Sequence, residues 1–579
     1  MQNTALNKTN LQNKASLIWN IADKIRGTYN EHEYGNIILP FVVLRRFDCI
    51  LEDTKAEVLK VHAQIADDNP LKSHSLKEAS GYAFYNTSEY TFQKLIDDPN
   101  NIVSNFRDYL QGFSENVRDI LECFELDNHI DRLEGKGNKK GGKKLLYPII
   151  KEFAGENLGI DEISNIEMGY IFEEIIRKFS ESHNASAGQF YTPREVIELM
   201  THILFCNDAS ILSSTALKSI YDPACGTGGM LSVAQDYIKS LNPDAKLHLY
   251  GQELTRMTWA ICQSDMLIKN NSAKSENIAL GDTLTHDGHH GERFDYIISN
   301  PPFGGNWKDD KSRIEEEVKK GRFSAGLPAT SDSQMLFLQH AIDKMNPKGG
   351  RVAIIHNASP LFSGEAGSGE SEIRKYILEN DFLEAIIALP NEIFYNTPIA
   401  SYILVLTNQK EAKRKNKVQL INANGLFERR RKSLGKKRND ISQEIIKEIT
   451  RIYKNFEENA ISQIHDTREF GYTHITIQRP KRDEEGQIIY KAKKMQSDSE
   501  LRIYERVPFT EDIQEYFQRE VLPYAPDAWI DESKHKEGYE IPFTRYFYQY
   551  TPPKSSSQIL QELQSLESQA TLLAKKVFS

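Results

Sequence analysis

The tetrapeptide Asn300-Pro301-Pro302-Phe303 combines residue types that can act together on a planar amino group. The Asn300 side chain and the Pro301 carbonyl, whose direction Pro302 restricts, offer two hydrogen-bond acceptors, and the Phe303 ring offers a stacking surface. A Pro-Pro loop on its own would more simply end a strand. The four residue types indicate activation of an NH2 group only if other functional residues gather at the same place.

The apolar run 294–299 comes directly before the tetrapeptide and predicts a buried parallel strand. Two consecutive prolines cannot continue a sheet ladder because each lacks an N–H group. The strand must therefore end at Asn300. Open α/β sheets place their ligand sites at the carboxyl ends of strands, so we expect a site here.

A glycine-rich segment, 221–229, leads from an earlier predicted strand into a helix. Its glycines allow a ligand to approach the backbone closely. A dinucleotide fingerprint would require a glycine at position 231, where Leu231 stands, and this departure disfavours a nicotinamide cofactor. The candidate ligand contacts in this segment are Asp222, Thr227, Gly228 and Gly229.

Acidic residues end the next two predicted strands. Glu253 follows the strand 247–252, where a carboxylate can bind two ribose hydroxyls. Asp282 and Thr283 follow the strand 278–281, where they can meet an adenine amino group. Each of these signals is weak alone, and their order along the chain makes them informative together.

The segment 188–195 precedes all of these strands. Thr192, Pro193 and Glu195 predict a capping box that opens a helix over 196–204. A helix N-terminus behind a glycine and two aromatic residues favours a carboxylate or another anion. Capping does not explain Gln189, Phe190 and Tyr191.

Predicted strands and helices alternate between residues 219 and 407, which indicates an α/β fold with a parallel sheet and helices on both faces. The predicted strands are 219–222, 247–252, 278–281, 294–299, 351–356, 383–389 and 402–407. The predicted helices between them are 229–241, 254–270, 333–346 and 370–380. A further helix is expected over 156–178, and the polar segment 304–331 is expected to be a functional or mobile loop.

In type and order these elements resemble the S-adenosylmethionine-dependent amino-methyltransferases of DNA, in their gamma class. More narrowly, the chain resembles the modification (methyltransferase) subunit of type I restriction-modification systems, over most of its length. The resemblance implies a Rossmann-like seven-stranded methyltransferase core, a helical N-terminal domain and a mixed, mostly helical C-terminal region. The expected divisions are a helical domain at 1–155, the core at 156–410, an accessory region at 411–553 and a tail helix for subunit contact at 554–579.

The resemblance implies methyl transfer from S-adenosylmethionine to the exocyclic N6 of a flipped adenine in DNA. In the gamma class the element before the glycine-rich segment contacts the methionine end of this cofactor. The resemblance therefore implies cofactor contacts by Gln189, Phe190, Tyr191, Thr192, Pro193 and Arg194. Asn300, Pro301, Pro302 and Phe303 would be catalytic, and Phe303 would stack on the base. The tetrapeptide does not separate adenine N6 from cytosine N4, and a protein-glutamine methyltransferase or a non-catalytic scaffold of the same fold remain alternatives. The implied partners are DNA, a restriction subunit, and a specificity subunit that is shared by two modification subunits.

Composition agrees with a protein that stays in the cytoplasm. The 579 residues carry a net charge of −10 and include 39% hydrophobic residues, and no apolar run could span a membrane or form a signal core. Five scattered cysteines support neither a disulfide framework nor a zinc site. We expect the cluster His286, His289 and His290 to form a solvated turn, and we predict no metal site.

Two basic segments and the tail complete the candidate surfaces. Segments 135–144 and 429–438 are rich in lysine or arginine, and the second is the first candidate for contact with phosphate in an acidic chain. Sequence alone does not decide whether either touches DNA. The tail carries a heptad pattern of apolar residues, which predicts either a packed terminal helix or a coiled-coil contact with another subunit. Its members are Ile559, Leu563, Leu566, Ala570, Leu573 and Val577.

Overall fold

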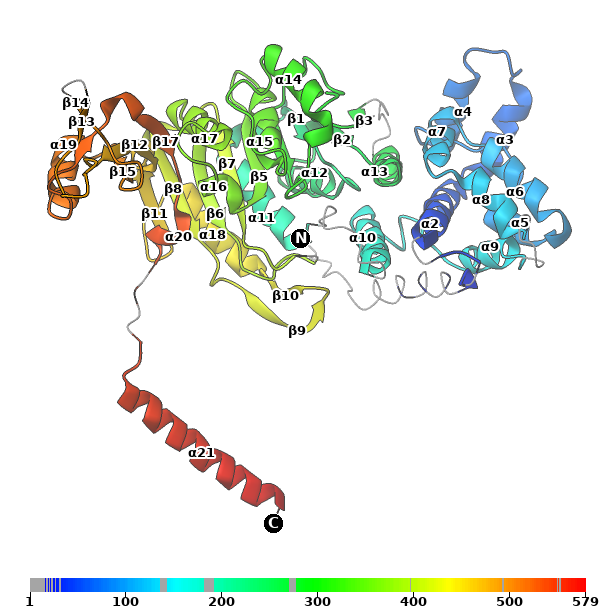
Figure 1. Ribbon diagram of the computed structural model, residues 1–579. Helices are drawn as coiled ribbons and strands as arrows, with labels where there is room; N and C mark the ends of the chain where they lie inside the picture. Colours follow the sequence, from blue (N-terminus) through cyan, green and yellow to red (C-terminus); the bar gives the residue numbers. More distant parts are fainter. Residues whose placement is uncertain are drawn as a thin grey trace. The chain divides into compact units, whose positions relative to one another are not determined.

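A computed structural model shows the arrangement of the chain (Figure 1). It describes residues 16, 19, 21, 24–26, 28–30, 33–135, 143–181, 192–269, 277–395, 397–491, 494–548, 550 and 553–578. The chain divides into two units, Met1–Ile541 and Pro542–Ser579. Among the described helices, none is both long enough and apolar enough to cross a membrane.

The N-terminal part of the first unit is helical, as predicted. Helix α2 (Tyr34–Leu51) is buried along most of its length. Its Phe41 ring stacks on Phe106 at 5.6 Å and on Phe153 at 5.9 Å. The other helices around it are α3 (Lys55–Gln64), α4 (Lys72–Ser80), α5 (Phe92–Ile96), α6 (Ile102–Gln111), α7 (Glu115–Cys123), α8 (Leu126–Leu133) and α9 (Leu146–Ala154).

A nine-stranded sheet forms the centre of the first unit, in the order β11-β8-β6-β7-β5-β4-β1-β2-β3. Strands β1 to β5 are parallel to one another, whereas β7 runs antiparallel between β5 and β6. The strands are β1 (Leu217–Asp222), β2 (Lys246–Glu253), β3 (Ile278–Leu280), β4 (Tyr296–Ser299), β5 (Arg351–Asn357), β6 (Leu383–Ala388), β7 (Ser401–Thr407), β8 (Lys417–Asn422) and β11 (Ser462–Asp466). The predicted α/β fold with seven core strands is confirmed, and β8 and β11 extend its edge.

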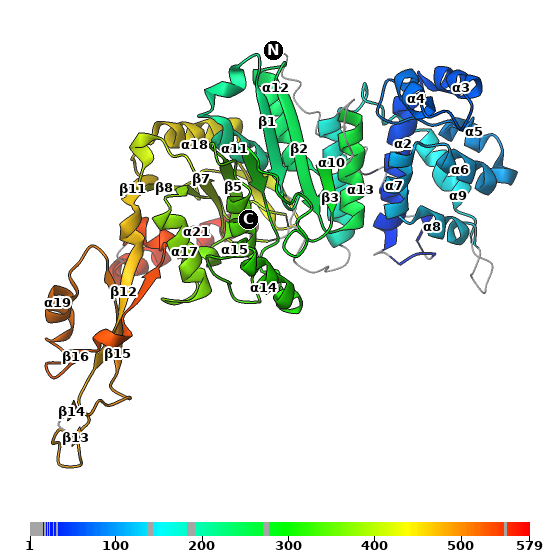
Figure 2. The ribbon, with the colours of Figure 1, turned by 90° about the horizontal axis from the view of Figure 1, so that it is seen from above.

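Helices cover both faces of this sheet (Figure 2). On one face, α11 (Arg194–Phe205) contacts β4 and β5 and lies between α12 (Gly229–Leu241) and α18 (Gln443–Asn455). On the other face, α15 (Gln334–Asp343) and α16 (Ser359–Phe362) pack on β5, and α17 (Gly369–Glu379) packs on both helices. Helix α13 (Arg256–Lys269) contacts β2 and β3, and its residue Ile261 joins the core of the N-terminal helices.

Two segments differ from the prediction. The helix expected over 156–178 begins only at Asn165, as α10 (Asn165–Glu181). The segment before it is held in turns because the buried Arg46 guanidinium donates hydrogen bonds to the carbonyls of Leu158 and Ile163, the latter at 2.6 Å. The expected loop 304–331 contains η5 (Lys308–Asp310) and helix α14 (Lys311–Lys319), because the Ile314 side chain finds a buried position.

Strands, rather than the expected helices, form most of the regular structure described between residues 411 and 541. Strand β12 (Gly471–Gln478) pairs with β15 (Ile503–Pro508), β16 (Trp529–Ile530) and β17 (Lys536–Tyr539). A separate two-stranded hairpin joins β9 (Glu428–Leu434) to β10 (Lys437–Asp440). The β-branched residues of β12 suit a sheet better than a helix, which explains the difference.

The second unit contains α20 (Phe543–Tyr546) and the tail helix α21 (Ser556–Phe578). The helix begins where the heptad pattern predicts. Four of its seam residues, Ile559, Leu563, Leu566 and Leu573, are exposed over 47–62% of their surface.

Candidate active site

The carboxyl ends of β1 to β4 border a cavity of about 530 Å³. This volume lies within the range of about 300–1,000 Å³ that is typical of ligand sites. The sheet order reverses between β1 and β4, where open α/β folds bind their ligands. The predicted residues that line the cavity are Thr192, Asp222, Thr227, Gly229, Glu253, Asp282, Thr283, Asn300 and Pro302.

Asp222 ends β1 and is only 1% exposed. Its Oδ1 accepts hydrogen bonds from the Ser299 hydroxyl at 2.7 Å and from the Ala224 N–H at 3.0 Å. Burial raises the pKa of Asp222 to about 7, and the nearby Glu253 carboxylate adds to this, although the two hydrogen bonds oppose it. A positively charged ligand group in the cavity would stabilise the ionised form.

Glu253 holds the glycine-rich turn in place. One carboxylate oxygen accepts from the Gly226 N–H at 3.0 Å, and the other accepts from the Thr255 N–H at 2.9 Å and from the Thr258 hydroxyl at 2.8 Å. Gly228, which precedes α12, has a φ of 83°, and a Cβ there would lie 2.8 Å from the Cys262 sulfur. Gly228 therefore shapes the turn, whereas Glu253 both shapes it and faces the cavity.

The two residues after β3 have different roles in the structure. Asp282 accepts from the Leu284 N–H at 2.9 Å and from the Thr285 hydroxyl at 3.1 Å, and it lines the cavity. The Thr283 hydroxyl donates to the Pro223 carbonyl at 2.6 Å. Thr283 therefore ties the turn after β3 to the turn after β1, and Asp282 presents the carboxylate.

Asn300 is oriented by a residue 108 positions earlier in the chain. Its Nδ2 donates to the Thr192 hydroxyl at 2.8 Å. Its Oδ1 is buried and has no hydrogen-bond partner among the described residues. A buried acceptor without a partner is costly, so this oxygen is ready to accept a hydrogen from a ligand.

The capping box predicted for Thr192 is wrong. Helix α11 begins at Arg194, Pro193 is its N-cap residue instead of its first helical residue, and no side chain caps the helix. The Thr192 hydroxyl is occupied by Asn300, and the Glu195 carboxylate pairs with Lys437. The sequence pattern suggested a local contact, whereas both side chains make distant ones.

The Phe303 ring lies in the core. It is 9% exposed and makes an edge-to-face contact with Phe394, at 6.4 Å between ring centroids. Pro302 borders the cavity, and Pro301 joins it to Asn300 in the turn after β4. Stacking of Phe303 on a base stays a prediction.

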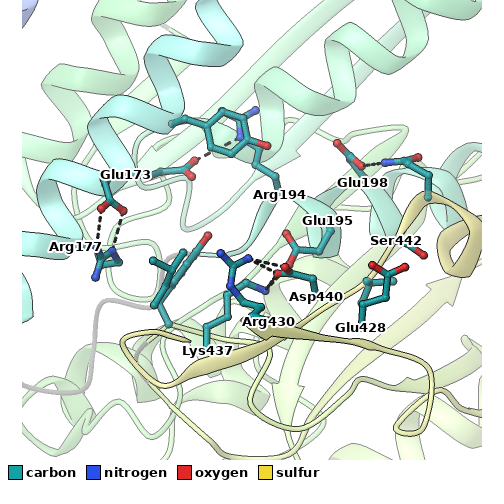
Figure 3. Close-up of a pocket in the computed structure, with 16 residues that line it drawn as sticks. Glu173, Arg177, Arg194, Glu195, Glu198, Glu428, Arg430, Lys437, Asp440 and Ser442 are labelled. Atoms are coloured by element: carbon teal, nitrogen blue, oxygen red, sulfur yellow. Dashed lines mark hydrogen bonds and ion pairs between the residues drawn. The ribbon is translucent and has the colours of Figure 1, made fainter. Parts of the chain in front are cut away.

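A second cavity, of about 430 Å³, lies between α10, α11 and the β9–β10 hairpin (Figure 3). The Arg194 guanidinium lies over the Tyr170 ring at 4.7 Å, and its Nε is 3.7 Å from the Glu173 carboxylate. Glu173 lines both cavities. Burial raises the pKa of Glu173, and the Arg194 charge opposes this shift.

Sequence reasoning missed Glu173, because the sequence does not show that its neighbours Phe172, Ile175 and Ile176 in α10 are buried. Arg194 faces the second cavity, so the cofactor contact predicted for it is not seen in the first. The predicted contacts Gln189, Phe190 and Tyr191 lie outside the described residues.

Only part of the histidine cluster forms the solvated turn that we expected. His286 and His290 are exposed, but His289 is buried beside the rings of Tyr221 and Tyr250. Its Nε2 lies 2.8 Å from the Gly251 carbonyl. His289 therefore holds the carboxyl end of β2 through its contact with the Gly251 carbonyl.

Comparison with known families decides how the first cavity is interpreted. The sequence model of the family described as N-6 DNA Methylase matches residues 164–476, which is more than half of the chain. The chain belongs to this family. A second model, described as HsdM N-terminal domain, matches residues 14–153 of this methylase.

Curated relatives and solved structures agree with the family. The type I restriction enzyme MjaIX methylase subunit of Methanocaldococcus jannaschii is 26% identical over 464 residues, which cover 76% of each chain. The MpnII methylase subunit of Mycoplasma pneumoniae is 24% identical, over 76% of this chain and 84% of that one. A type I methyltransferase subunit from Streptococcus thermophilus shares the fold with a TM-score of 0.63 at 23% identity, over 79% of this methylase and 97% of that chain.

The predictions of family, fold and enzyme class are thereby confirmed. The methylase is a modification subunit of the type I restriction-modification class and an adenine-specific DNA methyltransferase. The family match begins just before α10 and ends within β12, so it includes β8 and β11 beyond residue 410. The predicted division of the chain at residue 410 stays a prediction.

Proposed function

We propose that Asn300 and the Pro301 carbonyl activate the N6 amino group of an adenine that has flipped out of the DNA duplex. The observation that carries this proposal is the buried, unpartnered Oδ1 of Asn300, whose amide is oriented by Thr192. An aromatic amine is a poor nucleophile because its lone pair is delocalised into the ring. Two acceptors on its hydrogens localise the lone pair toward the methyl donor, so orientation and electrostatics provide the acceleration.

The first cavity fits S-adenosylmethionine. When bound, this cofactor supplies an electrophilic methyl group on a positively charged sulfur. The cavity presents the carboxylates of Asp222, Glu253 and Asp282, which suit a ligand with a positive charge and ribose hydroxyls. The residues proposed to hold it are Asp222, Thr227, Gly228, Gly229, Glu253, Asp282 and Thr283, with Thr192 at the boundary to the target base.

The target base must leave the duplex to reach this cavity. We propose that the Phe303 ring stacks on the flipped adenine. The support is that Phe303 directly follows Pro302, which borders the cavity. No strong base is required, because the amine loses its proton only after it has gained the methyl group.

We further propose that the methylase acts in the cytoplasm within a multisubunit complex. A specificity subunit would recognise the DNA sequence, two modification subunits would bind it, and a restriction subunit would complete the assembly. The support is that the curated relatives are named as subunits of type I restriction enzymes.

Transfer of a tritiated methyl group to unmethylated DNA tests the proposal, with and without the specificity subunit. We expect transfer only with that subunit and only when the DNA contains its recognition site. Digestion of the product should place the label in N6-methyladenine. Label in N4-methylcytosine, or no transfer by the intact complex, would contradict the proposal.

A further inference from the structure

The β9–β10 hairpin carries a cluster of basic side chains of two kinds. Four of them are paired: Arg429 and Arg438 with Glu392 at 2.8 and 3.6 Å, Arg430 with Asp440 at 2.5 Å, and Lys437 with Asp440 at 2.9 Å. The other three, Arg431, Lys432 and Lys436, are exposed and have no ion-pair partner among the residues that the structure describes. These three are called the tip cations below.

The tip cations are held on a rigid base. The Lys437 side chain is 1% exposed, pairs with Glu195 of α11, and donates to the Asn439 carbonyl at 2.7 Å and the Ile393 carbonyl at 3.2 Å. The backbone N–H of Lys436 donates to the Tyr395 carbonyl at 2.8 Å. Figure 3 shows Lys437 and Arg430 pointing from the hairpin into the network with Glu195 and Asp440. The turn between the strands is therefore fixed against the body of the methylase.

The hairpin borders a cavity that shares one lining residue with the active-site cavity. Arg430, Leu434 and Lys437 line the second cavity, and Glu173 lines both that cavity and the one that contains Asn300. We therefore expect a DNA strand whose base enters the active-site cavity to place its neighbouring phosphates on this side of the methylase. Because the chain has a net charge of −10, it needs local positive charge wherever it meets DNA.

We propose that the tip cations bind the phosphates of duplex DNA next to the flipped base. The proposal rests on the proposed function and adds the contact that holds the DNA. A protein partner is disfavoured because the tip presents Arg431, Lys432 and Lys436 around Ser433 and Gly435 without a large exposed apolar side chain. Lysine is depleted at protein–protein interfaces, whereas phosphate contacts use lysine and arginine.

DNA binding by the complex of methylase and specificity subunit tests this proposal. The triple variant Arg431→Gln, Lys432→Gln and Lys436→Gln should raise the Kd for unmethylated duplex about tenfold or more at moderate salt. Each phosphate contact contributes about 0.9 to the slope of log K against log salt, so the slope should fall by about 2–3. The methyl-transfer rate at saturating DNA and the affinity for cofactor should stay within twofold of wild type.

The matched control removes three positive charges from the opposite edge of the sheet. Lys246, Lys348 and Lys415 are exposed and lie at or just before the amino ends of β2, β5 and β8. Their triple change to Gln should leave both Kd and salt slope as in wild type. A tip variant that matches this control would overturn the proposal.

Loss of the specificity subunit from the tip variant during co-purification would also overturn the proposal, because the hairpin would then be a subunit contact. Failure of the proposed function is distinguishable from either result. A wild-type complex that binds DNA with the expected salt slope but transfers no methyl group would refute the reaction and leave the DNA contact standing.

Discussion

At the scale of single residues, the active site depends on the two ends of the Asn300 amide. Thr192 binds the nitrogen and leaves the oxygen free. Asn300→Ala should lower the methyl-transfer rate by roughly 10²–10³-fold, as loss of one preorganised hydrogen-bonding group does in other enzymes. Single-turnover kinetics measures the rate, and calorimetry should show cofactor affinity within twofold of wild type. A variant that keeps a tenth of the wild-type rate would show that the catalytic centre is elsewhere.

The pKa of Asp222 makes a prediction about stability. Burial raises it from the ordinary value of 3.8 to about 7, so the folded state binds more protons than the unfolded state between these values. The free energy of unfolding therefore falls as pH rises through this window, and the full penalty is present above pH 7. Asp222→Asn should stabilise the cofactor-free protein at pH 8 by on the order of 2–4 kcal/mol.

Thermal unfolding of both proteins from pH 4 to pH 8, without cofactor, measures this effect. The difference in Tm should vanish toward pH 4, where Asp222 is protonated in the folded protein. The same variant should bind cofactor more weakly, because it lacks the buried negative charge. Parallel pH profiles for the two proteins would contradict the assignment.

The sequence predicted the identity of these residues better than their contacts. Asp222, Glu253, Asp282 and Asn300 each follow an apolar run, and strand ends of a parallel sheet meet at one edge. Thr192 was misassigned because a cap three residues away is visible in the sequence and a hydrogen bond 108 residues away is not. Glu173 was missed because burial of its helix depends on tertiary packing.

At the scale of elements, a buried charge network joins the strands at the edge opposite the active site. Glu384 of β6 lies 2.8 Å from Arg351 of β5 and 3.4 Å from Arg414, and it accepts from the Tyr453 hydroxyl of α18 at 2.6 Å. Burial raises the pKa of Glu384, but the two guanidinium groups and the hydrogen bonds outweigh it and lower the pKa overall. The network thus fixes α18 and β8 to the methyltransferase sheet.

Glu384→Gln should lower the free energy of unfolding by about 3–5 kcal/mol, because it leaves the buried Arg414 and the partly buried Arg351 without their counter-charge. Tyr453→Phe is the milder control: it removes the hydroxyl that donates to Glu384 and accepts from Arg351, and it should cost about 1.5–3 kcal/mol. Denaturant titration measures both values. Cofactor affinity at 20 °C should not change in either variant, and a loss of affinity without a loss of stability would contradict a structural role.

Periodicity predicted which segments become strands but not how they pair. All seven residues of β7 are buried, and a fully buried strand carries no alternating pattern that would indicate its direction. Its antiparallel place between β5 and β6 therefore emerged only from the structure. The sequence of β9 and β10 predicts only a basic segment, because their many basic residues give no alternating strand pattern. The structure shows that the two strands pair and that Lys437 of β10 forms an ion pair with Glu195.

At the scale of the whole molecule, the sequence predicted a helical N-terminal part, a methyltransferase sheet and a tail helix in the correct order. It did not predict that the sheet continues to β8 and β11 or that β12 organises a second sheet. These additions pair strands far apart in the chain, such as β12 with β17. Local sequence patterns give no account of such pairing.

The exposed seam of α21 predicts how the methylase joins its complex. Ile559, Leu563, Leu566 and Leu573 are exposed, and a helix with such a seam gains stability by packing against a partner helix. Deletion of residues 556–579 should leave a chain that still binds cofactor but no longer co-purifies with the specificity subunit. Leu563→Asp with Leu566→Asp should have the same effect, because buried apolar side chains contribute about 1–3 kcal/mol each.

Gln561→Asp with Ser568→Asp is the matched control, since it adds the same charge on the opposite face of α21 and should leave the complex intact. Subunit affinity measured by calorimetry or quantitative co-purification separates the variants. Undiminished affinity of the truncated chain would show that the specificity subunit binds elsewhere. Equal loss in both double variants would show that added charge, rather than the apolar seam, disrupts the contact, so only the contrast between the two faces supports a coiled-coil interface.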